Sequence, residues 1–182
     1  MFKIAGKSSE KSVMTKPLVV KQGQVKQMTL PPGWREIKPF NNRTTDYSRE
    51  FAPPERDDVK IVFFYRGHRV HRKAGEQFLE VLSLPEHELS QDERVSVEWI
   101  IRNASEPDWF AIKSLRTEHV NRKVALVMEG LWLQNRMANL GLFFDADGTG
   151  TSIQEIHYTS PESDYFAFLP DAVSAIKSIV WK

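Results

Sequence analysis

The chain contains no cysteine. This absence excludes disulfide bonds, thiolate metal ligands and a cysteine nucleophile. Opposite charges almost cancel, because 25 Lys and Arg residues stand against 24 Asp and Glu residues and the formal net charge is +1. A protein with this charge has no overall attraction to nucleic acid or to anionic lipid. Nucleic-acid binding is therefore not expected.

Long hydrophobic runs are missing as well. No segment approaches the ~20 consecutive apolar residues that a membrane-spanning helix requires. Residues 1–16 are polar, rich in Lys and Ser, and contain no apolar core of signal-peptide length. The sequence therefore predicts a soluble, cytoplasmic protein without membrane insertion.

The 182 residues suffice for one domain with a sizeable hydrophobic core. Residues 1–16 show no periodicity and are predicted to be a flexible tail, which leaves 17–182 as a single domain. Alternating apolar residues predict strands, and apolar residues three and four apart predict helices. The expected elements are one or two strands within 17–30, extended chain at 34–40, a loop over 41–58, a strand at 59–65, helices at 74–82 and after Ser90, a strand from 109, and a strand at 124–128 covered on both faces.

A β-hairpin is predicted from residues 140–144 and 151–158. The dipeptide Asp147-Gly148 between them is preferred in two-residue turns, because both of its positions need a positive φ. Such a turn would place Leu142 opposite Ile153 on the neighbouring strand.

The chain is predicted to close with an amphipathic helix that starts after Thr159. Glu162 lies at capping-box spacing from this threonine, and apolar residues from Tyr165 to Val180 recur at helical intervals. Pro170 should kink or split the helix. Strands, a helical pair, a meander and a closing helix together indicate an α+β fold, an antiparallel β-sheet meander flanked by helices, rather than a doubly wound sheet.

Three segments carry a resemblance to a known family. They are Leu30-Pro31-Pro32-Gly33-Trp34, the run 117–123 leading into an apolar strand, and the closing Ser178-Ile179-Val180-Trp181. Together they resemble the PsbP-like superfamily, which includes a photosystem II extrinsic protein, a Ran-binding nuclear transport factor and bacterial effector chaperones. The resemblance implies an antiparallel sheet sandwiched by helices and a binding or accessory role. It implies no catalytic residues, because the superfamily shares none.

Asp145 and Asp147 support two alternative interpretations besides a turn. Their Asp-x-Asp-Gly-Thr pattern opens haloacid-dehalogenase-type phosphatases, in which the first Asp attacks phosphorus and the second protonates the leaving group. Only 32 residues follow Gly150, too few for the rest of such an enzyme. The same residues match the first positions of an EF-hand loop, but Ile156 occupies the position of its bidentate glutamate. A hairpin turn remains the preferred interpretation.

A basic segment follows the strand predicted at 59–65. Arg66, Arg69 and Arg72 are candidates for binding an anion or nucleic acid, and His68 and His71 have the spacing of a metal-ligand pair without an identifiable third ligand. A solvated surface loop is the plainer interpretation, because runs of charge usually form soluble surface.

Leu131, Trp132 and Leu133 follow one another in the sequence, with Met137 close by. Successive side chains of a strand point to opposite faces, so the three cannot all point into one core. At least one should reach the second face or an exposed patch, and such patches often mark a binding site for a partner. These four residues are the candidate partner site.

The sequence thus predicts a non-catalytic accessory or chaperone-like protein that recognises a protein partner through its sheet face or a groove. A metal-dependent protein or phosphohydrolase using Asp145 and Asp147 is the first alternative. Anion or nucleic-acid binding through residues 66–73 is the second. No cofactor and no small-molecule substrate are expected.

Overall fold

The computed structural model describes residues 18–19, 23–37 and 47–182. The tail expected over residues 1–16 lies outside this part of the chain, as does the stretch 38–46. The described residues form the predicted α+β fold, with a large antiparallel sheet, a small sheet and helices on both faces of the large one. No helix within the described residues is long and apolar enough to cross a membrane.

Ten strands and four α-helices make up these layers. The large sheet contains β3 (Arg35–Ile37), β4 (Arg49–Ala52), β5 (Lys60–Arg69), β6 (Phe110–Val120), β7 (Lys123–Trp132), β8 (Met137–Asp145) and β9 (Ser152–Pro161). The small sheet contains β1 (Leu18–Val19), β2 (Val25–Met28) and β10 (Val180–Trp181). The helices are α1 (Arg72–Ser83), α2 (Gln91–Ser96), α3 (Glu98–Ile101) and α4 (Tyr165–Lys177), and the 3-10 turn η1 (Arg102–Ser105) follows α3.

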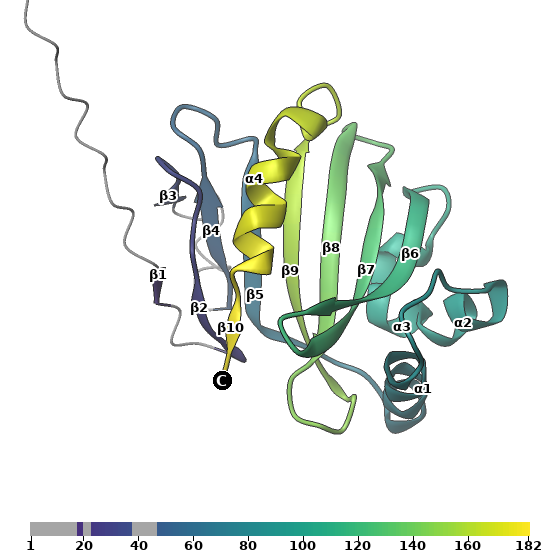
Figure 1. The fold of residues 1–182 in the computed structure, drawn as a ribbon. Coiled ribbons are helices and arrows are strands. Elements are labelled where there is room, and N and C mark those ends of the chain that lie inside the picture. Colours follow the sequence, from purple (N-terminus) through teal and green to yellow (C-terminus); the bar gives the residue numbers. More distant parts are fainter. Residues whose placement is uncertain (1–17, 20–22, 38–46) are drawn as a thin grey trace, which may run out of the picture.

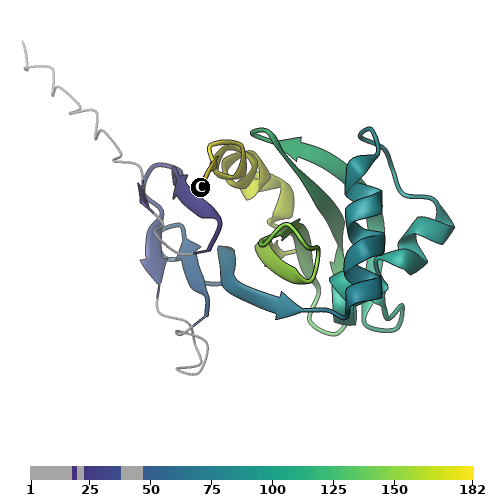
Figure 2. The ribbon, with the colours of Figure 1, turned by 90° about the horizontal axis from the view of Figure 1, so that it is seen from below.

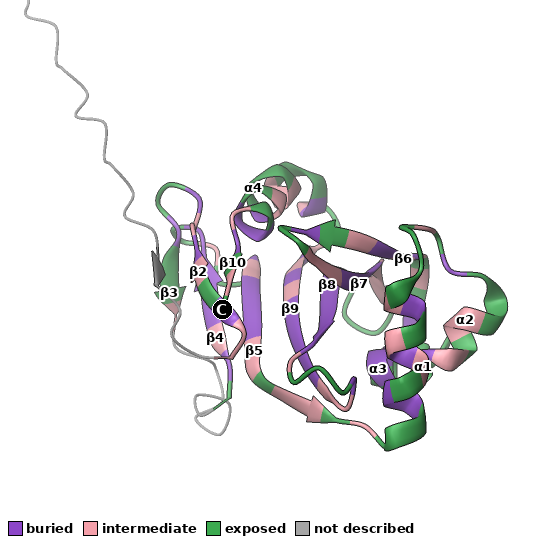
Figure 3. Cartoon of the chain, turned by 60° about the horizontal axis from the view of Figure 1, so that its bottom comes forward, coloured by how far each residue is buried: buried purple, intermediate pink, exposed green. Residues whose placement is uncertain are grey.

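The seven strands of the large sheet lie in the order β3-β4-β5-β9-β8-β7-β6. The small sheet and strands β3 and β4 form one end of the molecule, and α1, α2 and α3 form the other end (Figures 1 and 2). In the small sheet β2 lies between β1 and β10, so the first and last described strands belong to the same sheet. The central strands are largely buried, whereas α2 and the outer surface of α1 are exposed (Figure 3).

The alternation of side chains along each strand divides the core into two parts. On β8, Leu142 and Phe144 point to the face covered by α4, whereas Phe143 points to the face covered by α1 and α3. On β7, Val127 and Met128 divide between the two faces in the same way. The prediction of a strand covered on both faces is therefore confirmed.

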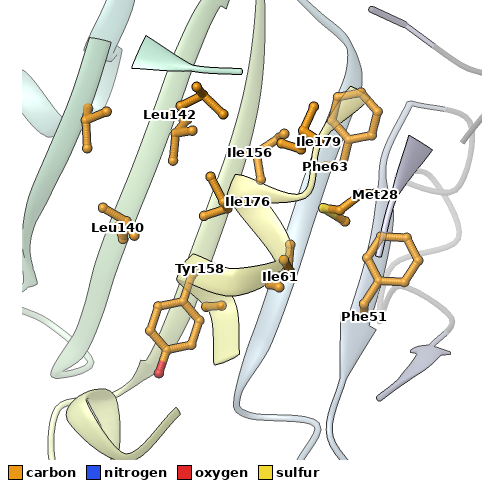
Figure 4. Packing of buried hydrophobic residues seen from close by; sticks show 14 of the residues in the cluster. Met28, Phe51, Ile61, Phe63, Leu140, Leu142, Ile156, Tyr158, Ile176 and Ile179 are labelled. Carbon is orange, nitrogen blue, oxygen red and sulfur yellow. The ribbon is translucent and has the colours of Figure 1, made fainter. Parts of the chain in front are cut away.

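Aliphatic and aromatic side chains fill the space beneath α4. Figure 4 shows Ile176 of this helix facing Leu140, Leu142 and Ile156 of the sheet. Tyr158 in the same layer is fully buried, and its hydroxyl donates to the carbonyl of Tyr165 at 2.8 Å. Burial raises the pKa of Tyr158 to about 12, so the phenol stays a neutral donor in this apolar layer.

The outer edge of β6 is partly covered by the segment 86–89. The Thr117 N–H donates to the carbonyl of His87 at 2.9 Å, and the Leu89 N–H donates to the carbonyl of Leu115 at 2.8 Å. A free edge strand would offer these groups to another chain. The middle of this edge is therefore satisfied within the molecule.

The predicted helix after Ser90 is confirmed together with its capping box. The Ser90 hydroxyl accepts from the Glu93 N–H at 3.4 Å, and the Glu93 carboxylate accepts from the Ser90 N–H at 2.8 Å. The Ser90 hydroxyl also donates to the Glu93 carboxylate at 2.7 Å, and this bond, together with the one from the Ser90 N–H, lowers the pKa of Glu93 to about 2. The helix is short, however, because Val97, with φ −106° and ψ 9°, leaves the helical conformation between α2 and α3.

The prediction of a loop over 41–58 is wrong for residues 49–52, which form β4. Phe51 and Ala52 are fully buried, and Glu50 pairs with Lys60 of β5 at 2.7 Å. The strand has few apolar residues and precedes Pro53, so it becomes recognisable only through its pairing with β3 and β5.

The hairpin of β8 and β9 is confirmed, but the predicted two-residue turn is wrong. Leu142 lies opposite Ile156, three residues from its predicted partner. The connection is longer because Asp145 organises a loop, its Oδ1 accepting from the N–H of Gly150 at 2.9 Å and from that of Asp147 at 3.4 Å. The acidic residue thus acts within the loop, as in Asx turns.

The closing helix begins later than predicted. Thr159 lies inside β9, and α4 begins at Tyr165 with Asp164 as an N-cap that makes no side-chain hydrogen bond. Glu162, the expected capping residue, forms an ion pair with Arg136 instead. Pro170 lies within one helix rather than between two, although it has no N–H to donate to the carbonyl of Phe166 one turn earlier.

The loop geometry leads to a first prediction. Asp145→Ala leaves the two N–H groups without their acceptor and should lower the free energy of unfolding by about 1–3 kcal/mol. Asp145→Asn retains a carbonyl oxygen and should keep most of this stability. Urea denaturation measures both variants. A loss in Asp145→Asn as large as that in Asp145→Ala would contradict the role of Oδ1 as a loop acceptor.

Candidate functional site

An apolar groove lies between the β6–β7 pair and the start of α4. Its volume is about 330 Å³, and Leu131 of β7, Ile112 of β6 and Phe166 of α4 contribute to its walls. Leu131 packs partly against the core beneath α4, whereas the Phe166 ring is 70% exposed. Lys113 lies at the groove with its ammonium 5.6 Å from the Phe166 ring centre.

The structure separates the four residues of the predicted partner site. Leu131 lines the groove on the α4 side, whereas Trp132 points to the other face and packs edge-on against Phe110, with ring centres 4.8 Å apart. Leu133 is 38% exposed, and Met137 is half-buried at the start of β8. Both faces are thus reached, as the alternation predicted, but the four side chains do not form one patch.

The basic segment is largely exposed, as predicted, but it forms the end of β5 and the start of α1 rather than a loop. Arg66 and Arg69 are exposed residues of β5, and Arg72 begins α1 and pairs with Glu76 at 2.7 Å. His71 caps α1 by accepting from the Ala74 N–H at 3.2 Å. The regular strand extends further than predicted because it continues to pair with β9 beyond an irregularity.

His68 separates from His71 and joins a cluster that the sequence analysis did not identify. Its Nδ1 donates to Oε1 of Glu155 at 2.7 Å. The other carboxylate oxygen, Oε2, accepts from Nε2 of His157 at 2.9 Å. The Glu155 side chain is 11% exposed, and both histidine side chains are similarly buried. One buried carboxylate thus lies between two imidazoles.

An irregularity in β5 places His68 in this cluster. Phe64 pairs with Glu155 and His68 with Ile153, so β5 uses two more residues than β9 over this interval. Gly67 has φ +61°, and a Cβ there would lie 1.8 Å from the Ile153 carbonyl oxygen. Only glycine fits at this close approach. The bulge therefore brings His68 to the side of Glu155.

The cluster continues onto β8. Nδ1 of His157 lies 3.1 Å from Oδ1 of Asn139, which faces the same side of the sheet. Gly141 lies opposite His157 in the pairing of β8 with β9, and a Cβ there would lie 3.0 Å from the imidazole. The absence of a side chain at Gly141 makes room for the ring. The Arg102 guanidinium lies 3.9 Å from Glu155 at the outer side.

Electrostatics keeps Glu155 ionised. Burial opposes ionisation, but the hydrogen bonds from His157 and His68 outweigh burial and lower the pKa of Glu155 to about 2. Because this pKa lies below the usual 4.5, the carboxylate stabilises the folded state at neutral pH. That contribution is lost as the pH falls from 4.5 towards about 2.

Two cavities border this polar cluster. One, of about 410 Å³, is lined by residues of β5, β8 and β9 and by Arg102 of η1. The second, of about 560 Å³, lies on the other side of Arg102 and is lined by His68, Arg69 and Trp99. Of the three candidate anion-binding arginines, Arg69 contributes to a cavity at this cluster, whereas Arg66 and Arg72 line neither.

The acidic loop shows a different arrangement from a metal or phosphatase site. Among the described residues, no group of three or more His, Asp or Glu side chains is placed to hold a metal ion. Thr149 donates to Oδ1 of Asp147 at 2.6 Å, and these loop bonds lower the pKa of Asp147. Both aspartates accept hydrogen bonds from their own loop.

The arrangement of the sheets and helices was compared with known proteins. The solution structure of cyanobacterial PsbP (CyanoP) from Synechocystis sp. PCC 6803 superposes with a TM-score of 0.56 over 97% of this chain and 98% of that chain, at 10% sequence identity. The chain has a PsbP-like fold. A crystal structure from Bacteroides thetaiotaomicron VPI-5482 matches with a TM-score of 0.42 over 88% of this chain and 49% of that one, at 13% identity.

The resemblance inferred from three short segments is thus confirmed as a PsbP-like fold. A scan against protein-family models finds no match, and neither does a search of curated proteins. The likeness at 10% identity concerns the fold alone, so a role for the chain depends on its own surfaces.

The bulge yields a second prediction. Gly67→Ala places a Cβ against the Ile153 carbonyl and should displace β5 from β9, which removes the His68 bond to Glu155. We expect a loss of about 2–4 kcal/mol in the free energy of unfolding, since strain and a weakened buried ion pair add. Gly148→Ala is the matched control, because Gly148 also has a positive φ, +81°, but nothing lies within 4 Å of its Cβ position.

Thermal and urea unfolding of the two variants provide the comparison. The free energy of unfolding of Gly148→Ala should fall by only about 1–2 kcal/mol, the cost of placing alanine at a positive φ. If Gly67→Ala were no more destabilising than Gly148→Ala, the close approach at the bulge would be refuted.

Proposed function

We propose that the protein is a non-catalytic accessory protein that binds a protein partner through the apolar groove beside α4. The observation that carries this proposal is the Phe166 ring, which is 70% exposed beside a groove that contains Leu131. An exposed aromatic ring next to an apolar groove is a feature typical of partner sites. The PsbP-like fold supports an accessory role, because the superfamily shares no catalytic residues.

The charges around the groove indicate the kind of partner. Glu129 is paired with Arg116 at 3.1 Å, and Glu162 is paired with Arg136. Lys113 forms no ion pair with a carboxylate of the described residues and contacts the Phe166 ring instead. The groove therefore favours a peptide segment with an apolar anchor side chain and an acidic residue beside it.

The other interpretations of the sequence gain less support. A phosphatase of the haloacid-dehalogenase type is built on a parallel sheet, whereas all pairings of the described strands here are antiparallel. The three arginines proposed for anion binding do not converge, because only Arg69 lines a cavity at the histidine cluster.

Phe166→Ser tests the proposal. Phe166 is largely exposed, so the variant should fold normally while partner affinity falls at least about tenfold, which corresponds to 1.4 kcal/mol. Val95→Ser is the matched control, because Val95 of α2 is 58% exposed and lies far from the groove on the other face. A photo-crosslinking residue at position 166, compared with one at 95, identifies the partner and its contact site.

The measurement is affinity purification under native conditions with quantification of the crosslinked partner. We expect crosslinking from position 166 and a loss of the partner in Phe166→Ser alone. Equal recovery of the partner with Phe166→Ser and with Val95→Ser would contradict binding through the groove.

A further inference from the structure

The cavity of about 410 Å³ beside Glu155 combines charged side chains with apolar walls. Glu50 and Glu155 are negative, and Lys60 and Arg102 are positive. Glu50 is paired with Lys60 at 2.7 Å, and Glu155 accepts hydrogen bonds from His68 and His157. Arg102 is thus a cationic side chain of this cavity that has no hydrogen-bonded carboxylate among the described residues.

A buried amide provides a second, independent observation. Asn139 lines this cavity and is 1% exposed. Its Oδ1 lies 3.1 Å from Nδ1 of His157, and its Nδ2 has no hydrogen-bond partner among the described residues. A buried donor normally has an acceptor in the protein or in a bound molecule. Nδ2 of Asn139 is therefore available to donate to an oxygen of a ligand in the cavity.

Arg102, which lines the cavity, has an unusual backbone conformation. It has φ 55° and ψ −123° where α3 gives way to η1, a region that favours glycine. The guanidinium has no hydrogen bond within the described residues and reaches only to 3.9 Å from Glu155. Arg102 thus has a strained backbone and guanidinium N–H groups that bond to no described residue. Such a guanidinium is suited to pairing with an incoming anion.

Aromatic side chains form much of the apolar wall. The rings of Phe64 and Phe143 contact His157 edge-on, with ring centres 5.8 and 5.4 Å from that of the imidazole. Trp132 of β7 lines the same cavity. These edges and faces suit a flat ring, which packs against aromatic side chains in edge-to-face or offset geometry.

We propose that this cavity binds a small aromatic carboxylate, with the carboxylate held by Arg102 and Asn139 and the ring placed among Phe64, Phe143 and Trp132. This site is separate from the groove beside α4, which lies on the other face of the sheet. It therefore does not depend on the proposed protein partner. The size of the cavity lies in the range of small-molecule sites.

Two acids, phenylacetate and indole-3-acetate, are the probes, and phenylacetamide is the uncharged counterpart of the first. Binding is measured by NMR titration of the full chain, following the side-chain amide of Asn139 and the backbone amides of η1. We expect saturable binding of at least one acid, the largest shifts at Asn139 and Arg102, and at least tenfold weaker binding of phenylacetamide.

Arg102→Gly separates binding from folding. Glycine adopts the backbone conformation at position 102 without strain, so the midpoint of thermal unfolding should stay the same or rise while the affinity for the acid falls at least tenfold. Arg122→Gly is the matched control, because Arg122 also has a positive φ, 73°, and lies in the distant turn between β6 and β7. It should change the affinity less than twofold.

Three results would overturn the proposal. The first is the absence of saturable binding by both acids at millimolar concentration. The second is equal affinity for phenylacetate and phenylacetamide, which would show that the charge is not recognised. The third is an equal loss of affinity in Arg102→Gly and Arg122→Gly, which would show attraction by surface charge alone.

Discussion

The ionised carboxylate of Glu155, buried on one face of the large sheet, is the constraint on which much of this structure depends. A buried charge is costly unless it is paired and hydrogen-bonded. Here each carboxylate oxygen accepts from one imidazole, at 2.7 and 2.9 Å. The bulge at Gly67 brings the first imidazole into place, and the missing side chain at Gly141 makes room for the second. Two glycines, one on each of the strands that flank β9, thus make room for the two imidazoles that bind this carboxylate.

The same sheet carries two surfaces of different chemistry because its side chains alternate between faces. On the α4 side, Leu131 and the exposed Phe166 form an apolar groove suited to a peptide segment. On the other side, α1 and α3 cover one end of the face, and the cluster around Glu155 occupies the part next to η1. The fold thus presents an apolar groove and a cavity beside a polar cluster on opposite faces of its large sheet, without overlap between them.

The sequence predicted the parts of the fold that depend on local pattern. The strand at β5, the capping box at Ser90 and the hairpin of β8 and β9 all follow from periodicity and cap chemistry. It failed where tertiary contacts decide, as in β4, whose short sequence becomes a strand through its two neighbours. It also missed the cluster, because His68 was read as part of a loop. Glu155 and His157, two residues apart on a predicted strand, were the available signal, since that spacing places both on one face.

Carbon-detected NMR of the Glu155 side-chain carboxyl during a pH titration tests the central claim most directly. The account predicts that this carboxyl stays ionised through the acid range and titrates with a pKa of about 2, because His157 and His68 donate to both of its oxygens. His68→Gln should then move the titration upwards, because it removes the imidazole that donates to Oε1 of Glu155. A carboxyl that titrates near the usual 4.5 in the native protein would contradict the account, because it would show that Glu155 is not held between two imidazoles.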